Sequence, residues 1–339
     1  MEQERPILVT GAAGFIGART CELLLEAGWR VHGLDNLNGY YDPRLKQLRL
    51  EDLQGRPGFT FQTLDIEDAE AVDTVFATQP YAAVVNLAAR AGVRASIEDP
   101  HAYVGTNVTG CLNLLESMQR HGVTKMVLAS TSSLYAGQPM PFREDQPVDQ
   151  PISPYAATKK AAEALAYSYH HLYGLDVTVT RFFTVFGPRG RPDMAVFRFI
   201  RGIDAGEPIE VYGDGTQLRD FTYIDDIAAG VVAALKPVGY EVVNLGRGDR
   251  SLSVNDLIHC LEEALGKPAQ VRYLPTHEAD MPATLADARK AKVLLGWEPR
   301  WDPVDGFRES AHWYLANKDR LVRNSNTATS VAQVTSPTE

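Results

Sequence analysis

Cysteine is scarce in this sequence of 339 residues, which holds only Cys21, Cys111 and Cys260. The three are far apart and odd in number, and none belongs to a Cys-x-x-Cys or Cys/His cluster. Such a distribution supports neither a disulfide framework nor a zinc site, so we expect no metal. We interpret the cysteines as small buried side chains of a protein in a reducing compartment.

Positive charge is also in deficit. The chain has 33 Lys and Arg residues against 43 Asp and Glu residues, which gives a net charge of -10 and an isoelectric point near 5.3. A surface of this sign repels phosphate backbones and anionic lipid at long range. We therefore expect no nucleic acid or membrane partner, and any anionic substrate must be met by a few local arginines.

Long apolar runs are missing as well. No stretch approaches the roughly 18 apolar residues that span a bilayer. The first six residues are charged and lead straight into a predicted strand, which is not the pattern of a signal peptide. These features predict a cytoplasmic protein.

What the first half does contain is an alternation of short β-branched runs with helical patterns. This alternation predicts an α/β fold of the Rossmann type, with a doubly wound parallel sheet. Ser153 and Pro154 should begin one helix as N-cap and first helical residue, and Gly174 should follow its end. The strands are expected at 7–9, 30–34, 59–64, 83–87, 126–129 and 177–181, and the helices at 18–27, 68–78, 107–121 and 154–173.

After about Gly187 glycine and proline cluster, and the elements become short. Strands near 210–212 and 241–245 and helices near 226–235 and 254–265 are expected here. We predict a main domain over 1–186, with 223–248 returning to it. Residues 187–320 should form mainly a smaller, mixed α/β region that binds substrate, and 321–339 a disordered tail.

A glycine motif lies directly between the first strand and the first helix. Its glycines allow a tight turn and a close approach to a pyrophosphate, which then rests on the N-terminus of the helix. Asp35 ends the second strand, where a carboxylate binds both hydroxyls of an adenosine ribose and repels a 2′-phosphate. Because 36–38 bring no basic side chain, NAD is favoured over NADP. The motif comprises Gly11, Gly14, Phe15, Ile16 and Gly17, and further cofactor contacts are expected from Asn36, Asn38, Asp65, Ile66, Leu87, Ala88, Ala89 and Asn107.

A tyrosine and a lysine, Tyr155 and Lys159, lie four residues apart on one face of a predicted helix. Residues 129–135, which include Thr131, form a hydroxyl-rich segment that leaves a predicted strand. Together with the glycine motif, these features resemble the extended short-chain dehydrogenase/reductase family, specifically its nucleotide-sugar epimerases and dehydratases. The resemblance runs from about Ile7 to about Trp301 and includes the runs 213–216 and 219–226.

The resemblance implies that Tyr155 is the base that takes a sugar hydroxyl proton while hydride leaves for NAD. The pKa of a tyrosine, about 10, must then fall by roughly 3. Lys159 and the positive nicotinamide are expected to lower it, and Lys159 also to hold the nicotinamide ribose. Thr131 would orient or shuttle the proton.

The two residues after Thr131 distinguish members of the family. Sugar-nucleotide 4,6-dehydratases carry Asp-Glu there, and UDP-glucuronate decarboxylases typically carry a glutamate nearby. Ser132 and Ser133 occupy these positions here and offer no proton-transferring carboxylate. A 4-keto sugar in such a site can only turn over and be reduced on its other face, which is 4-epimerisation.

The runs 39–46, 91–94 and 181–194 resemble UDP-glucuronate 4-epimerases, which interconvert UDP-glucuronate and UDP-galacturonate. One departure is Tyr135-Ala136-Gly137, which replaces the usual Tyr-Gly. A 4-epimerase of UDP-glucose or of a UDP-N-acetylhexosamine, or a non-catalytic sensor of nucleotide sugar or NAD, remain as alternatives. The resemblance suggests a homodimer through the helices near 107–121 and 154–173. It also implies a substrate cleft lined by Arg94, Thr131, Ser132, Ser133, Thr184, Arg191, Phe197, Arg219 and Asp280.

Overall fold

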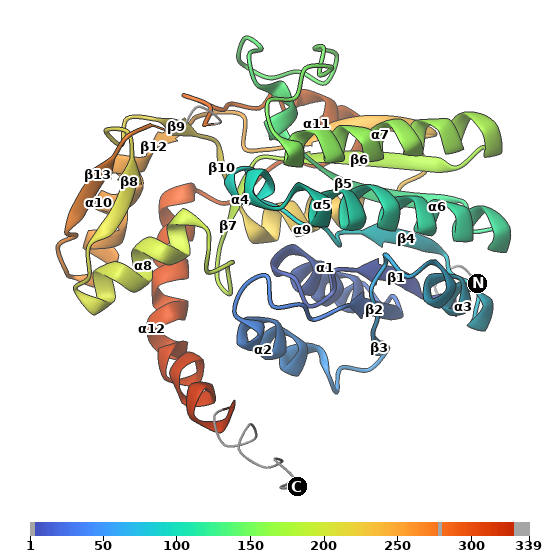
Figure 1. Ribbon diagram of the computed structural model, residues 1–339, viewed down its shortest axis with the longest axis horizontal. Helices are drawn as coiled ribbons and strands as arrows, with labels where there is room; N and C mark the ends of the chain where they lie inside the picture. The colour runs from blue at the N-terminus through green and yellow to red at the C-terminus, as the bar shows by residue number, and fades with distance from the viewer. Residues whose placement is uncertain (1–3, 277–279, 329–339) are drawn as a thin grey trace, which may run out of the picture.

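The centre of the molecule is a seven-stranded parallel sheet (Figure 1), seen in a computed structural model that describes residues 4–276 and 280–328. Its strand order is β3-β2-β1-β4-β5-β6-β11, and every neighbouring pair is parallel. The predicted Rossmann-type doubly wound sheet is therefore confirmed. The strands are β1 (Ile7–Thr10), β2 (Val31–Asp35), β3 (Phe59–Thr63), β4 (Ala83–Asn86), β5 (Lys125–Thr131), β6 (Asp176–Phe182) and β11 (Tyr240–Leu245).

Helices cover both faces of the sheet, which explains why its strands consist of near-continuous apolar runs. Successive residues of a strand enter opposite cores: Leu8 packs with one set of helices, and Ile7 and Val9 pack with the other. One face carries α3 (Ala69–Thr78), α6 (Gly110–His121) and α7 (Pro154–Tyr173). The other carries α1 (Phe15–Glu26), α9 (Ile224–Ala233) and α11 (Arg289–Leu295).

The helix signals at α7 act as expected. The Ser153 side chain accepts a hydrogen bond from the backbone N–H of Ala156 at 3.2 Å, Pro154 is the first helical residue, and Gly174 follows the helix with a left-handed backbone, at φ 71°. These local signals fix both ends of the helix that carries Tyr155 and Lys159.

The substrate-side region has its own apolar core beside the sheet, and α8, α10 and α12 pack around it (Figure 1). Three separate two-stranded sheets pair β7 with β10, β8 with β13, and β9 with β12. β11 returns to the main sheet beside β6, whereas the proposed domain division remains a prediction. The elements are β7 (Thr184–Phe186), α8 (Ala195–Ala205), β8 (Ile209–Tyr212), β9 (Leu218–Arg219), β10 (Phe221–Tyr223), β12 (Leu252–Ser253), α10 (Val254–Leu265) and β13 (Val271–Leu274).

The start of the predicted tail differs from expectation. Helix α12 (Pro303–Ala328) includes residues 321–328, whereas 329–339 lie outside the described residues. Phe307, Ala311, Tyr314 and Leu321 recur at helical spacing and pack on the substrate-side core. This apolar stripe extends the helix past the point where the composition alone suggested disorder.

Several short elements near the carboxyl ends of the strands were not expected from the sequence. They are α2 (Pro43–Leu53), α4 (Val93–Glu98), α5 (Pro100–Val104), a π-helical turn η2 (Gly105–Thr109) and a 3₁₀ turn η3 (Ser132–Tyr135). None of the helices in the described ranges is both long and apolar enough to cross a bilayer.

Candidate active site

The residues singled out from the sequence gather at one edge of the sheet. Asp35 ends β2, Thr131 ends β5, and the glycine turn follows β1. In a parallel sheet the carboxyl ends of the strands share an edge, and ligands bind where the strand order reverses, here between β1 and β4. The topology thus brings the predicted cofactor and catalytic residues together.

The glycine turn leaves no room for side chains. Gly11 has φ 70°, and a Cβ built on it would lie 2.7 Å from the backbone nitrogen of Ala88. A Cβ on Gly17 would lie 2.0 Å from the carbonyl oxygen of Gly11. Helix α1 has no side-chain cap among the described residues, so the N–H groups of its first turn remain available for a phosphate. This cradle fits the pyrophosphate of NAD.

The flanking residues Phe15 and Ile66 direct their side chains away from such a ligand. Phe15 packs in the substrate-side core with Phe186 and Phe197. Ile66 lies in the core beneath α3 and α6. Ile16 is half-buried between two of the cores. Because their side chains are occupied in packing, we expect Phe15 and Ile66 to contribute to cofactor binding through their backbones.

Asp35 has a basic partner that the neighbouring sequence does not reveal. Lys46, from α2, donates to Asp35 Oδ1 at 3.0 Å and to Asn38 Oδ1 at 3.3 Å. The backbone N–H of Leu37 also donates to Asp35 Oδ1, at 2.8 Å, and Asn36 donates to Asp65 at 2.8 Å. Within the described chain, Asp35 Oδ2 accepts no hydrogen bond, which leaves it for a ribose hydroxyl. The ammonium of Lys46 also weakens the expected repulsion of a 2′-phosphate by Asp35.

Asn107 holds the loop that follows β4. Its side chain accepts from the backbone N–H of Arg90 at 2.9 Å and donates to the carbonyl of Arg90 and to Thr158, each at 3.0 Å. Leu87, Ala88 and Ala89 begin this loop, and the N–H of Ala88 donates to Thr10 at 3.3 Å. The side-chain oxygen and nitrogen of Asn107 are therefore bonded within the chain, and they hold the loop in place.

Thr131, Tyr155 and Lys159 come together from β5 and α7. Thr131 Oγ1 accepts from the backbone N–H of Ser133 and donates to Ser133 Oγ, both at 3.1 Å. Lys159 is buried, with 4% of its surface exposed. The Tyr155 ring makes an edge contact with the Tyr103 ring, at 6.1 Å between centroids. This arrangement places a phenol, a hydroxyl pair and an ammonium at one end of the sheet.

The charge states of this group follow from burial. Burial raises the pKa of Tyr155, against a hydrogen bond with Thr131 and the positive charge of Arg191, which both lower it. Burial lowers the pKa of Lys159 to about 8, while the Cys111 and Glu163 side chains favour its protonated form. Lys159 is thus mostly protonated at pH 7. Lys159, which was expected to lower the pKa of Tyr155, is not among the groups that act on it, and the charge that does lower it is that of Arg191.

A buried polar network lies beneath this group. Glu163, one turn after Lys159, accepts from Ser130 at 2.7 Å and from the Arg181 guanidinium at 2.9 and 2.8 Å. Arg181 also donates to Tyr135 at 2.8 Å, and Tyr135 donates to Asn244 at 2.8 Å. The network ties the ends of β5 and β6 to α7, and therefore fixes Thr131 relative to Lys159. Sequence reasoning missed it because each of its hydrogen bonds joins residues that lie 18 or more positions apart.

Three of the predicted substrate residues, Thr184, Arg191 and Phe197, line one pocket. It lies between β7, the loop 187–194, α8 and α12, and Phe15 reaches it from α1. Arg191 pairs with Asp193 at 2.5 Å and donates to the carbonyl of Ala91 at 3.1 Å.

A second group is formed by Arg94, Arg219 and Asp280. Arg94 pairs with Asp280 and stacks on the Tyr212 ring, 3.6 Å from its centroid. Burial lowers the pKa of Arg219. The negative charge of Asp280 raises this pKa, and the positive charge of Arg94 lowers it further. The three charges therefore lie close enough to affect one another, as an anion clamp requires.

The loop after β4 is held by residues that were not among the predicted site residues. Tyr40 donates to the carbonyl of Ala91 at 2.7 Å, and Tyr103 donates to that of Gly92 at 3.0 Å. Arg90 lies over the Tyr40 ring at 5.3 Å, and its Nε is buried without a partner in the described residues. A buried arginine nitrogen of this kind is suited to an anionic ligand, but only the folded loop reveals its burial.

Comparison with known proteins identifies the family of this chain. Residues 7–246 match the NAD dependent epimerase/dehydratase family. A UDP-glucuronate 4-epimerase of Thermodesulfobacterium geofontis is 56% identical over 310 residues, which cover 91% of this chain and 96% of the relative. The crystal structure of the Bacillus cereus UDP-glucuronic acid 4-epimerase with UDP-glucuronic acid and NAD is similar at TM-score 0.85 and 37% identity, covering 91% and 98% of the two chains.

A UDP-glucose 4-epimerase of Thermotoga maritima, solved with UDP-glucose, is also similar, at TM-score 0.83 and 33% identity, covering 92% of this chain and 99% of that one. The chain belongs to the NAD-dependent epimerase/dehydratase family. NAD is accordingly its cofactor. The roles of individual residues remain predictions, supported by the geometry above.

The Glu163–Arg181 pair yields a prediction about stability. Glu163→Gln leaves the buried Arg181 charge unpaired, so we expect a loss of about 3–5 kcal/mol of unfolding free energy at pH 7. Burial raises the pKa of Glu163, but its bonds with Arg181 and Ser130 outweigh this and lower it. The contribution is therefore full above the unfolded pKa of about 4.3 and disappears as the pH falls through the folded value. Urea unfolding at pH 7 and at pH 3.5 to 4 measures it.

Two further variants control this measurement. Glu163→Gln combined with Arg181→Met removes both charges and should recover much of the lost stability. Glu26→Gln removes an exposed carboxylate and should change the unfolding free energy by less than about 0.5 kcal/mol. A loss at Glu163→Gln no larger than at Glu26→Gln would contradict the importance of the buried pair.

Proposed function

We propose that this chain is a UDP-glucuronate 4-epimerase, which interconverts UDP-glucuronate and UDP-galacturonate through a transient 4-keto sugar. The observation that carries the proposal is the sequence Thr131-Ser132-Ser133 at the end of β5, beside Tyr155 and Lys159. Neither position after Thr131 has a carboxylate for elimination or decarboxylation. The similarity to the enzymes of Thermodesulfobacterium geofontis and Bacillus cereus supports the same substrate.

The catalytic step follows from the residues at the sheet edge. Tyr155 accepts the proton of the C4 hydroxyl, Thr131 orients that hydroxyl, and the protonated Lys159 stabilises the phenolate. Bound NAD supplies the hydride acceptor, held at the Gly11–Gly17 turn and by Asp35. After the 4-keto sugar turns its other face to the cofactor, Tyr155 returns the proton. Because the hydride returns to the sugar, the cofactor is regenerated in every cycle.

The charge distribution favours retention of the sugar carboxylate. A 4-keto glucuronate is a β-keto acid, which loses CO₂ readily. Arg191 and Arg94 already have carboxylate partners, Asp193 and Asp280. We therefore assign the sugar carboxylate to the neutral hydroxyls of Ser132 and Ser133, because the N–H of Ser133 is already bonded to Thr131 Oγ1. Such donors bind the acid without supplying a proton to C5, and they hold a carboxylate better than a departing CO₂.

The second candidate is a 4-epimerase of UDP-glucose or of a UDP-N-acetylhexosamine. The similarity to the Thermotoga maritima enzyme favours it. A site selective for a glucuronate must bind the acid sugar better than the neutral one, so a comparison of the two substrates separates the candidates.

We also propose that the enzyme is a cytoplasmic homodimer. Helices α6 and α7 lie side by side on one face of the sheet (Figure 1). Large apolar side chains are exposed there and on the adjoining α5: Val104, Tyr167, Leu172 and Tyr173, each about half exposed or more. Exposed apolar side chains of this size are typical of an interface between subunits. The cytoplasmic location rests on the free cysteines.

Sedimentation velocity tests the dimer. Leu172→Glu puts a charge on the most exposed of these side chains and should convert a dimer to monomers at micromolar concentration. Val293→Glu is the matched control, because Val293 is 87% exposed on α11 at the opposite face. A wild-type chain that sediments as a monomer would contradict the proposal.

The catalytic assignment predicts that Tyr155→Phe binds UDP with wild-type affinity but loses turnover. Loss of a general acid–base group lowers kcat by about 10²–10⁴. The phenyl ring preserves the contact with Tyr103, so folding should be unaffected. Calorimetry with UDP and a single-turnover assay measure the two effects. Wild-type kcat at pH 7 and pH 9 would show that another group takes the proton.

The substrate assignment predicts UDP-galacturonate as product, with no release of CO₂. ¹H NMR of UDP-glucuronate with the purified protein should show this conversion without added NAD, and the denatured protein should release NAD rather than NADP. Equal kcat/KM for UDP-glucose would support the second candidate. Accumulation of a UDP-4-keto-pentose would contradict the proposed protection of the carboxylate.

A further inference from the structure

A fully buried arginine outside the predicted catalytic group joins the cofactor turn to the substrate side. Arg49, on α2, has no exposed surface. Its guanidinium donates to the carbonyl of Ala13 at 3.2 Å, to Tyr41 Oη at 2.7 Å, and to the carbonyls of Arg189 and Gly190 at 2.6 and 3.3 Å. Each of these acceptors is neutral, and burial lowers the pKa of Arg49. A buried cation held by neutral groups is costly and suggests a function beyond stability.

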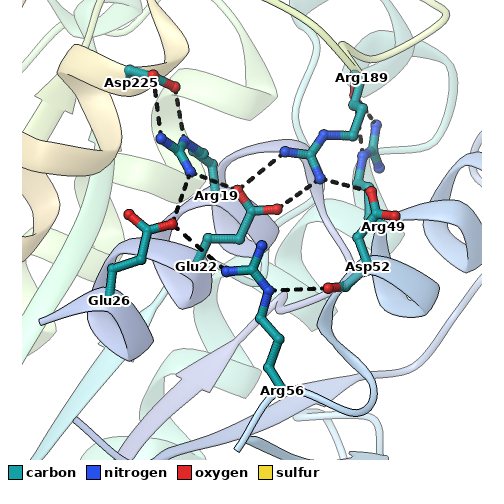
Figure 2. A network of polar contacts seen from close by, with 8 residues as sticks. All are labelled: Arg19, Glu22, Glu26, Arg49, Asp52, Arg56, Arg189 and Asp225. Atoms are coloured by element: carbon teal, nitrogen blue, oxygen red, sulfur yellow. Dashed lines mark hydrogen bonds and ion pairs between the residues drawn. The ribbon is translucent and has the colours of Figure 1, made fainter. Parts of the chain in front are cut away.

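Arg189 is held at both its backbone and its side chain. It adopts a left-handed conformation, with φ 60°, which is unfavourable for a residue with a Cβ. Arg49 donates to the carbonyl of Arg189. The guanidinium of Arg189 itself donates to Glu22 at 2.7 and 3.1 Å and to Asp52 at 3.0 Å. Figure 2 shows Arg189 between α1, which carries Glu22, and α2, which carries Arg49 and Asp52.

Glu22 joins the side chain of Arg189 to the rest of the cofactor domain. It is 2% exposed and also accepts from Arg19 at 2.7 Å, and Arg19 in turn pairs with Asp225 at the start of α9 (Figure 2). Burial alone would raise the pKa of Glu22, but Arg189 and Arg19 lower it. Glu22 is thus a carboxylate at neutral pH, and the side chain of Arg189 is anchored to a rigid part of the fold.

The anchored segment leads directly into the substrate pocket. Two residues after Arg189, Arg191 contacts the carbonyl of Ala91 and lies 5.6 Å from the centre of the Tyr40 ring. Gly187, Gly190 and Arg191 all line the pocket that contains Thr184 and Phe197. A shift of Arg189 would therefore move Arg191 and open this wall of the pocket.

We propose that Arg49 and Arg189 are positioning residues that fix the loop 187–194 against the cofactor turn, and so set the affinity for the UDP-sugar without taking part in proton or hydride transfer. The proposal rests on the proposed function for the identity of the sugar, but not for the binding of UDP. It assigns a function to a cluster built from α1, α2 and the loop 187–194, none of which carries Tyr155 or Lys159.

The same contacts link the two ligands thermodynamically. Arg49 binds the carbonyl of Ala13, which precedes Gly14 in the turn that would hold the pyrophosphate. If bound NAD fixes the position of this turn, it also fixes the position of the Arg189 carbonyl, because the planar guanidinium of Arg49 donates to both carbonyls. Because such coupling is reciprocal, an occupied UDP site should also slow the loss of NAD.

The test compares Arg49→Met, Arg189→Gly and the double variant as NAD-bound enzymes. Glycine tolerates φ 60°, so Arg189→Gly removes the side-chain anchor without backbone strain. We expect the Kd for UDP, measured by calorimetry, and the KM for UDP-glucuronate each to rise about tenfold or more, with kcat changed by less than threefold. The double variant should add less than threefold to the larger single effect, because both residues act on one loop.

Arg56→Met is the matched control, since Arg56 is partly exposed and contacts Glu26 and Asp52 at the edge of the same cluster (Figure 2). It should leave Kd, KM and kcat unchanged. A merely structural role would lower the melting temperature of the variants but leave the Kd of the folded fraction at the wild-type value, which would overturn the proposal. A fall in kcat at unchanged Kd would also overturn it. If Arg49→Met does not fold, Arg189→Gly decides the question.

A wild-type enzyme that binds UDP but does not convert UDP-glucuronate would contradict the proposed function alone. The loop proposal would then still be tested by the Kd for UDP. Release of NAD from the wild type should be slower with saturating UDP than without it, and Arg189→Gly should abolish the difference. Equal release rates in the wild type would overturn the coupling between the two sites.

Discussion

The close approach of the Gly11 backbone to that of Ala88 is the constraint on which the site depends. Any Cβ at position 11 would lie 2.7 Å from the Ala88 nitrogen, so only glycine permits β1 and the loop after β4 to lie this close. The approach occurs where the strand order reverses, and it therefore creates both the turn for the pyrophosphate and the position of the loop 88–92. Asn107, Tyr40 and Arg191 then fasten that loop from three separate parts of the chain.

Two buried charge clusters support this site from opposite sides. Glu163 and Arg181 join β5, β6 and α7 beneath the catalytic group, and they form a paired, hydrogen-bonded unit. Arg49 instead donates to neutral acceptors and joins the cofactor turn to the loop 187–194. The first arrangement is suited to holding reacting groups at fixed distances. The second is suited to communicating between two ligands, because the position of one guanidinium affects both binding regions.

Much of this could be predicted from the sequence because the signals are local. The alternation of strands and helices, the glycine spacing and the Ser153-Pro154 helix start each depend on neighbouring residues, and the structure contains all three. Local patterns failed where packing decided the outcome. The helical stripe of α12 was hidden in a polar composition.

The sequence by itself determined the fold class, the family and the order of chemistry-bearing residues along the chain, since these follow from motifs of a few residues. Only the tertiary structure decided which charges meet. Lys46 reaches Asp35 from a different element, Arg49 reaches Arg189 across 140 residues, and Arg94 pairs with Asp280, which lies 186 residues away. Electrostatic pairs depend on distance in space and on burial, and neither quantity is encoded in a local pattern.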